Sequence, residues 1–172
     1  EESIEMVARY AGEATAITHA HPRAALASVI YLIFARALIR GLSKLEAYRR
    51  SCDLVQHHYG EHPELPHFKR IVDRDLERLE ETDIESTGYC VHTLEASLWT
   101  LLHTESFSEA VITVVNLGGD TDSIGAVTGG LAGMLYGAAA IPGQWIRVLA
   151  KNKEIMKLAL RFMRALTYAR TA

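Results

Sequence analysis

Several signatures of secreted proteins and of common enzyme classes are missing from this sequence. Its 172 residues include only two cysteines, Cys52 and Cys90, which are too few for a disulfide scaffold. No segment resembles a signal peptide, so a reducing cytoplasm is the expected location. There is no P-loop and no Gly-x-Ser-x-Gly nucleophile elbow. The glycines at 129–133 follow no strand and so do not form a dinucleotide fingerprint.

The charge of the chain is low and unevenly distributed. A formal net charge of −3 and a pI near 6.3 imply no general affinity for nucleic acid. Residues 61–85 hold nine acids against four Lys/Arg, whereas residues 144–172 hold seven Lys/Arg against Glu154 alone. We interpret both segments as solvated helix faces, with a docking patch as the alternative. Four histidines within residues 57–67 match no zinc spacing, and neither cysteine lies close to them in sequence.

Helical periodicity extends over almost the whole chain, and no segment alternates as a strand does. There is no internal repeat or linker, so the sequence predicts one all-α domain. Ser43 with Glu46 and Ser106 with Glu109 have the spacing of helix starts. The predicted helices are about 2–18, 22–41, 43–60, 68–81, 90–103, 108–116, the glycine-rich segment 124–137, a short helix after Pro142, and 153–170.

Two acids and two hydroxyls stand in four consecutive residues, Asp120-Thr121-Asp122-Ser123, which we call the acidic turn. Carboxylate and hydroxyl oxygens are the donors that Mg²⁺ prefers. The preceding pair Gly118-Gly119 permits an irregular backbone in which both acids converge on one point. The alternative is a helix N-terminus crowded with capping residues. The residues alone leave both interpretations open.

The segment after the acidic turn carries a glycine at every fourth position, namely Gly125, Gly129, Gly133 and Gly137, with Gly130 beside them. Each glycine costs a helix interior roughly 1 kcal/mol relative to alanine, so we expect compensation by the close approach of another helix. The segment lacks the length and apolar flanks of a membrane span, and no membrane partner is expected. The predicted fold is a compact orthogonal multi-helix bundle around this buried, glycine-striped central helix.

The acidic turn and its helix resemble the C-terminal signature of the ADP-ribosylglycohydrolase family, which includes the dinitrogenase reductase-activating glycohydrolases. Three further stretches agree with the family, Thr18–Pro22, Thr87–Val91 and His92–Trp99. The matches run in order from about residue 4 to about residue 150. The resemblance implies an enzyme that hydrolyses the N- or O-glycosidic bond joining ADP-ribose to a protein side chain. Its substrate would be an ADP-ribosylated protein or a small ADP-ribosyl compound.

The resemblance also implies roles for particular residues. Asp120, Asp122 and Ser123 would bind a pair of Mg²⁺ ions, with Mn²⁺ as a substitute. His19, Gly88 and Tyr89 would bind substrate, with His19 donating to phosphate or ribose oxygens and Tyr89 next to the adenosine. Without the resemblance, His19 and His21 are read as one helix cap and one solvated side chain. Gly88 and Tyr89 are then a turn glycine and a surface tyrosine.

The resemblance covers only part of the family pattern. Family members are longer and carry an N-terminal half with a Thr-Asp-Asp-Thr metal motif, whereas this sequence has no adjacent pair of aspartates. We therefore expect residues 1–172 to be the C-terminal part of a single all-α domain. The absent N-terminal part would be its partner and would supply the general acid or base. The alternatives are a non-catalytic ADP-ribose-binding module and a structural relative such as the jellyfish lens crystallins.

Overall fold

A computed structural model describes the backbone of residues 3–171 and the side chains of residues 3–166. Within these residues the regular elements are all helical, which confirms the all-α prediction. The α-helices are α1 (Ile4–Ala16), α2 (Pro22–Ile39), α3 (Lys44–Tyr59), α4 (Lys69–Val72), α5 (Cys90–His103), α6 (Phe107–Asn116), α7 (Thr121–Tyr136), α8 (Gly143–Val148) and α9 (Asn152–Thr171).

Two helices begin where the sequence predicted caps. The Ser43 hydroxyl accepts a hydrogen bond from the Glu46 backbone N–H at 3.3 Å, and the Glu46 carboxylate accepts one from the Ser43 N–H at 3.2 Å. The Ser106 hydroxyl accepts from the Glu109 N–H at 3.1 Å. These bonds satisfy N–H groups that the first turn of a helix leaves without partners, and so fix the starts of α3 and α6.

The predicted helix over residues 68–81 is wrong. Residues 65–83 instead contain α4 and three short 3₁₀ turns, Leu65–Phe68, Asp75–Glu77 and Glu81–Asp83. Arg74 interrupts this segment with a left-handed backbone at φ 66°. Its guanidinium binds Asp53 and donates to the Arg49 carbonyl, both on α3. The left-handed backbone at Arg74 interrupts a helix, and the contacts of its guanidinium with α3 offset the cost of that conformation. Charge patterning alone does not predict such long-range contacts.

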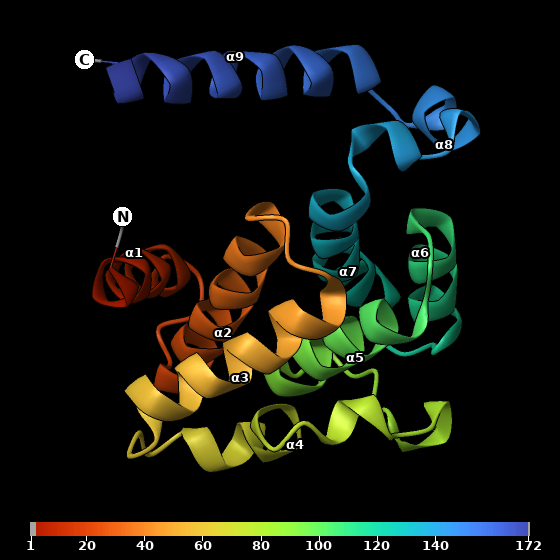
Figure 1. Cartoon of the computed structure of the whole chain (residues 1–172). Coiled ribbons are helices and arrows are strands. Elements are labelled where there is room, and N and C mark those ends of the chain that lie inside the picture. The colour runs from red at the N-terminus through yellow and green to blue at the C-terminus, as the bar shows by residue number, and fades with distance from the viewer. Residues whose placement is uncertain (1–2, 172) are drawn as a thin grey trace. The chain divides into compact units, whose positions relative to one another are not determined.

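Residues 1–140 form one compact unit in which α2, α5 and α7 pack against one another. The outer helices complete this unit, with α1 and α3 on α2 and with α6 on α5 and α7 (Figure 1). Its core includes fully buried side chains from four helices, namely Phe34, Tyr48, Leu98 and Ile124. The same packing fixes the N-terminal ends of α5 and α7. The acidic turn lies at the start of α7.

Among the described helices, α2 is long and apolar enough to cross a membrane by length and composition. Half of this helix is buried inside the unit, where Ile30 and Phe34 are only 2% and 1% exposed. Burial of this kind is typical of the core helix of a globular unit.

Helix α7 differs from the predicted buried central helix. Its buried side chains are Ile124, Thr128, Leu131 and Ala132. The stripe residues Gly129 and Gly133 have no atom within 4 Å of the position that a methyl group would take. A methyl group on Gly130 would lie 2.7 Å from the hydroxyl of Tyr31 on α2, so α2 approaches α7 closely at Gly130. The stripe lies about one residue, or 100°, around the helix from the buried row, so α7 is buried on one face only.

Residues 141–172 form a second unit, described here by itself. It contains α8 and α9, as predicted from Pro142 and from the periodicity of residues 153–170. Between these helices Lys151 has a left-handed backbone at φ 57°, and the Asn152 side chain donates to the Ile146 carbonyl at 2.7 Å.

Candidate functional site

The site begins where two turns, one before α5 and one before α7, touch each other. The Asp120 N–H donates to the Ser86 carbonyl at 2.9 Å, and the Ser86 hydroxyl donates to the Leu117 carbonyl at 3.1 Å. Gly119, at φ 65°, faces the same carbonyl, and a methyl group there would lie only 2.1 Å from the oxygen. Only glycine permits this approach, and the two turns are thereby fixed to each other.

Gly88 brings the Asp120 carboxylate to the edge of α5. A methyl group on Gly88 would lie 2.5 Å from Asp120 Oδ2, so the carboxylate occupies the space that a side chain would take. Sequence analysis expected Gly88 to allow close approach of a ligand. The close neighbour in the structure is Asp120, so a residue predicted to bind substrate directly contacts one predicted to bind metal.

The acidic turn forms the N-terminus of α7. Asp120 occupies the N-cap position, but its side chain makes no capping hydrogen bond, which argues against the capping interpretation for this residue. The Asp120 side chain, followed by the backbone N–H groups of Asp122 and Ser123, holds the pKa of the Asp122 carboxyl below its usual range. The two carboxyl groups belong to one turn, at a helix end whose dipole favours negative charge.

The donors of the acidic turn suit part of a Mg²⁺ shell. Asp120, Asp122 and Ser123 offer two carboxylates and a hydroxyl, and Mg²⁺ commonly takes one or two protein carboxylates and fills its octahedron with water and substrate oxygens. Among residues 3–166, no three or more His, Cys, Asp or Glu side chains gather into a metal-binding group. The acidic turn therefore offers the donors for only part of a metal shell among the described residues.

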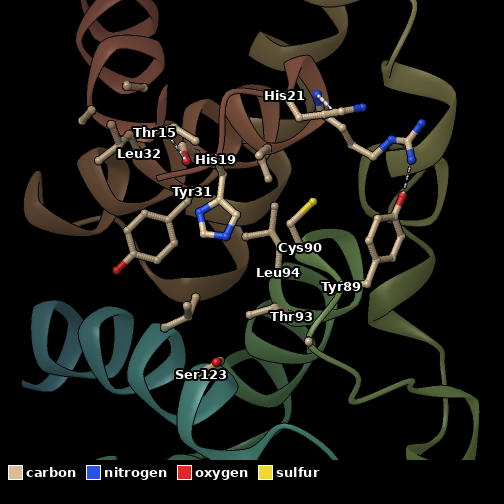
Figure 2. Close-up of a pocket in the computed structure, with 18 of the residues that line it drawn as sticks. Thr15, His19, His21, Tyr31, Leu32, Tyr89, Cys90, Thr93, Leu94 and Ser123 are labelled. Carbon is tan, nitrogen blue, oxygen red and sulfur yellow. Dashed lines mark hydrogen bonds between the residues drawn. The ribbon is translucent and has the colours of Figure 1, made fainter. Parts of the chain in front are cut away.

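A cleft of about 910 Å³ runs along α2 and past the starts of α5 and α7 (Figure 2). Its volume lies in the range of pockets that bind cofactors and nucleotide-sized ligands. Four of the six residues predicted for the site line this cleft, namely His19, Gly88, Tyr89 and Ser123. Asp120 adjoins it through Gly88, and Asp122 lies between Asp120 and Ser123 in the same turn. The structure therefore brings the six predicted residues to one region.

The two histidines before α2 have different environments. The His21 Nδ1 accepts from the Arg23 N–H at 3.1 Å, so His21 caps α2. His19 is exposed, lines the cleft, and shares a hydrogen bond of 2.9 Å with the Thr18 hydroxyl. The cap expected from sequence is therefore His21, and the imidazole of His19 remains accessible from the cleft.

Tyr89 stands at the rim of the cleft with 36% of its surface exposed. Its hydroxyl accepts a hydrogen bond from the Arg23 guanidinium at 2.9 Å, drawn as a dashed line in Figure 2. The His92 ring meets the Tyr89 ring edge-on, with centroids 4.9 Å apart. Tyr89 is therefore held at both its hydroxyl and its ring.

Sequence analysis missed several residues of the cleft, including Arg23 and Tyr31. Tyr31 follows Ala24 and Ala27 at helical spacing, so periodicity along α2 was a usable signal for a shared face. The burial of Tyr31 in this wall raises the pKa of its hydroxyl. Arg23 had no such signal, because its side-chain partners lie 41 to 66 residues away in the sequence.

Comparison with known proteins agrees with the family resemblance of the sequence motifs. The model of the ADP-ribosylglycohydrolase family matches residues 1–171. ADP-ribosylarginine hydrolase Tri1 of Serratia proteamaculans is 43% identical over 77 residues, which are 45% of this chain and 21% of that protein. ADP-ribosyl-(dinitrogen reductase) glycohydrolase of Rhodospirillum rubrum is 39% identical over 70 residues, 41% of this chain and 24% of that protein.

A solved structure described as an ADP-ribosylglycohydrolase-related protein complex matches this fold with a TM-score of 0.76 and 33% sequence identity. The match covers 94% of this chain and 52% of the solved chain. This chain thus spans about half the length of that relative, and its matches to the two named hydrolases cover a fifth to a quarter of theirs. From the family match along its length, we conclude that the chain belongs to the ADP-ribosylglycohydrolase family.

Proposed function

We propose that this chain forms one wall of the active site of a hydrolase that removes ADP-ribose from modified protein side chains. Two relatives are named for ADP-ribosylated proteins, and one of those names specifies ADP-ribosylarginine, so we take ADP-ribosylarginine as the first substrate to test. In such a reaction the bond between ribose C1 and the side-chain nitrogen breaks. The hydroxyl of water goes to the ribose, and its proton goes to the departing nitrogen.

One observation carries this proposal: His19, Gly88, Tyr89 and Ser123, drawn from three separate parts of the sequence, line one nucleotide-sized cleft. The accessible imidazole of His19 would donate to a phosphate or ribose oxygen. The face of Tyr89 would stack on adenine, a kind of contact worth roughly 1–3 kcal/mol per base in nucleic-acid complexes.

The acidic turn is the proposed metal-binding part of the site. Asp120, Asp122 and Ser123 would hold Mg²⁺, or Mn²⁺ in its place, and a second ion would need carboxylates beyond those described. The ion, when bound, supplies charge stabilisation at the ribose oxygens and a lowered pKa for a bound water. The contact of Asp120 with Gly88 supports this placement, because it sets the proposed metal site directly beside the cleft.

The decisive experiment is a titration of Mg²⁺ into the protein by calorimetry, followed by ADP-ribose. Asp122→Asn should weaken Mg²⁺ binding at least about tenfold and leave the melting temperature nearly unchanged, because Asp122 is exposed. Glu61→Gln, which alters an exposed acid outside the cleft, is the matched control. Equal Mg²⁺ affinity in the wild type and Asp122→Asn would refute the metal site.

A turnover assay separates the hydrolase from the alternative of a non-catalytic ADP-ribose-binding module. The assay uses a protein in which this chain is joined to the N-terminal half that the family resemblance implies, because that half would supply the general acid or base. Release of ADP-ribose from an ADP-ribosylarginine peptide, dependent on Mg²⁺ and abolished by Asp120→Asn, supports the hydrolase. Tight ADP-ribose binding without release by this longer protein, under any metal condition, supports the binding module.

A further inference from the structure

Arg23 connects three segments at the rim of the cleft that are far apart in the sequence. Its Nε donates to the Glu64 carboxylate at 2.6 Å, its Nη1 to the Tyr89 hydroxyl at 2.9 Å, and its Nη2 contacts His67 Nε2 at 2.6 Å. These bonds link the start of α2, the segment from Glu64 to His67 after α3, and the turn before α5. A guanidinium has five N–H donors in a fixed fork, which suits it to hold several partners at defined angles.

The ion pair with Glu64 is the firmest of these contacts. Only 24% of the Arg23 side chain and 19% of the Glu64 side chain are exposed. The Arg23 guanidinium holds the pKa of the Glu64 carboxyl below its usual range. A charge-assisted bond at 2.6 Å in this partly buried place is stronger than a neutral hydrogen bond, so Glu64 fixes the guanidinium in place.

The Nη2 contact further restricts Arg23. Because a guanidinium only donates, His67 Nε2 must accept here, which requires a neutral His67 ring with its proton on Nδ1. Each of the three guanidinium nitrogens therefore has a protein partner. Arg23 lines the cleft, and each of its three guanidinium nitrogens uses one N–H group to hold a wall of the cleft.

The far side of Tyr89 is held by a second group. His92 packs edge-on against its ring, and His92 Nδ1 is hydrogen-bonded to the Thr87 hydroxyl at 2.8 Å. Thr87 also accepts from the Tyr89 N–H at 3.3 Å. This support comes from residues of the same turn and its helix, so it cannot fix the turn relative to α2. Among the hydrogen bonds of the described side chains, the bond from Arg23 is the one that ties Tyr89 to α2.

We propose that Arg23, anchored by Glu64, is a positioning residue that fixes the Tyr89 ring in the orientation in which it receives the adenine of ADP-ribose. This inference rests on the proposed function and extends it, because Arg23 acts through Tyr89 and not through contact with the ligand. A ring already fixed in its binding orientation loses less side-chain entropy when the ligand binds. Loss of the Arg23 bond should therefore weaken binding while the stacking surface remains.

A double-mutant cycle tests the proposal through ADP-ribose affinity, measured by calorimetry on the full chain. Arg23→Lys keeps the positive charge, but a single ammonium cannot hold three partners in fork geometry. We expect Arg23→Lys and Tyr89→Phe each to weaken binding about fivefold, and the double variant to be no weaker than either single variant. Arg9→Lys is the control, because Arg9 also lies near a carboxylate, Glu13 at 3.8 Å, but does not line the cleft.

A second measurement needs no ligand. Carbon-13 relaxation of the Tyr89 ring should show greater ring motion in Arg23→Lys and in Glu64→Gln than in the wild type, and no change in Arg9→Lys. An unchanged Tyr89 ring in both variants would overturn the proposal, whether or not ADP-ribose binds. Additive losses of affinity in the cycle would overturn it too, since they would mean that Arg23 contacts the ligand itself. A wild type that binds no ADP-ribose while its Tyr89 ring responds to Arg23→Lys would refute the proposed function alone.

Discussion

At the scale of single residues, two glycines with different surroundings allow effects on metal binding to be separated from effects on stability. At Gly88 an added methyl group would meet a carboxylate oxygen of Asp120, whereas at Gly119 it would meet the backbone carbonyl of Ser86. The Asp120 side chain can rotate away from a methyl group. The Ser86 carbonyl cannot move without the whole turn.

Gly88→Ala is therefore predicted to damage function more than stability. The displaced Asp120 carboxylate should weaken Mg²⁺ binding about tenfold, which corresponds to roughly 1.4 kcal/mol, with only a small fall in melting temperature. Gly119→Ala, strained at φ 65° and blocked at 2.1 Å, should lower the melting temperature strongly. Calorimetry and thermal denaturation of both variants check this contrast. Normal Mg²⁺ affinity in a folded Gly88→Ala protein would contradict it.

How far the sequence predicts the site depends on whether a residue's role is local. The acidic turn could be singled out because its donors are consecutive, and a cap at His19 or His21 because a cap bonds to a residue two positions away. The fixation of Tyr89 could not be predicted, because Arg23 lies 66 residues away and no periodicity relates the two. The contact of Gly88 with Asp120 was hidden for the same reason, although each residue was singled out separately.

At the scale of elements, helix α5 carries a buried acid that the proposed chemistry does not use. Glu95 is 4% exposed, and Arg70 on α4 lies 3.4 Å from it. Burial raises the pKa of the Glu95 carboxyl, which Arg70 offsets only in part, while Glu85 and Asp75 raise it further. The folded state therefore binds this proton more tightly than the unfolded chain does. The stability that the protonated Glu95 carboxyl contributes is present at low pH and is lost as the pH rises through the raised pKa.

Glu95→Gln should remove this pH dependence. At pH 8 the variant should melt at the same temperature as the wild type or higher, because it no longer buries a charge and Arg70 can remain hydrated. The difference in melting temperature between the variant and the wild type should shrink as the pH is lowered, because Glu95 in the wild type becomes protonated. Thermal denaturation of both proteins from pH 8 downwards is the measurement. A much lower melting temperature for Glu95→Gln at pH 8 would show that the ion pair with Arg70 outweighs the cost of burial.

Helix α7 offers a second test, on its glycine stripe, which is open at Gly129 and Gly133. A methyl group at Gly129 meets nothing within 4 Å among the described residues. Gly129→Ala should therefore stabilise the helix by up to about 1 kcal/mol and raise the melting temperature by roughly 2–4 °C. Gly130→Ala, which would press on the Tyr31 hydroxyl at 2.7 Å, should gain less. A fall in melting temperature for Gly129→Ala would mean that the stripe packs against something in solution.

The helices show where periodicity suffices and where it fails. Helices α2 and α5 are rich in apolar residues because both cross the core, and their ranges were predicted to within two residues. The helix predicted over residues 68–81 was wrong because the Arg74 guanidinium binds α3 and the Arg74 backbone adopts the left-handed region. The glycine stripe was assigned to the wrong face, since its spacing identifies a row but not which neighbouring row is buried.

At the scale of the whole molecule, the account depends on one cleft within residues 1–140. Family membership is established along residues 1–171, whereas the ligand and the metal are proposals that rest on the geometry of this cleft. Its walls come from α1, α2, α5 and α7, so a ligand bound there should be sensed by residues distant in the sequence. Spectroscopy that reports on each residue can test this directly.

The most direct measurement is a titration of ADP-ribose into ¹⁵N-labelled protein with Mg²⁺ present, followed by amide chemical shifts. The account predicts that the largest shifts cluster at His19, Gly88, Tyr89 and Ser123, and that they diminish when EDTA removes the metal. It also predicts no comparable shift in α3, which lies outside the cleft. Saturable binding with its shifts confined elsewhere, or no binding at millimolar ADP-ribose, would contradict the central claim.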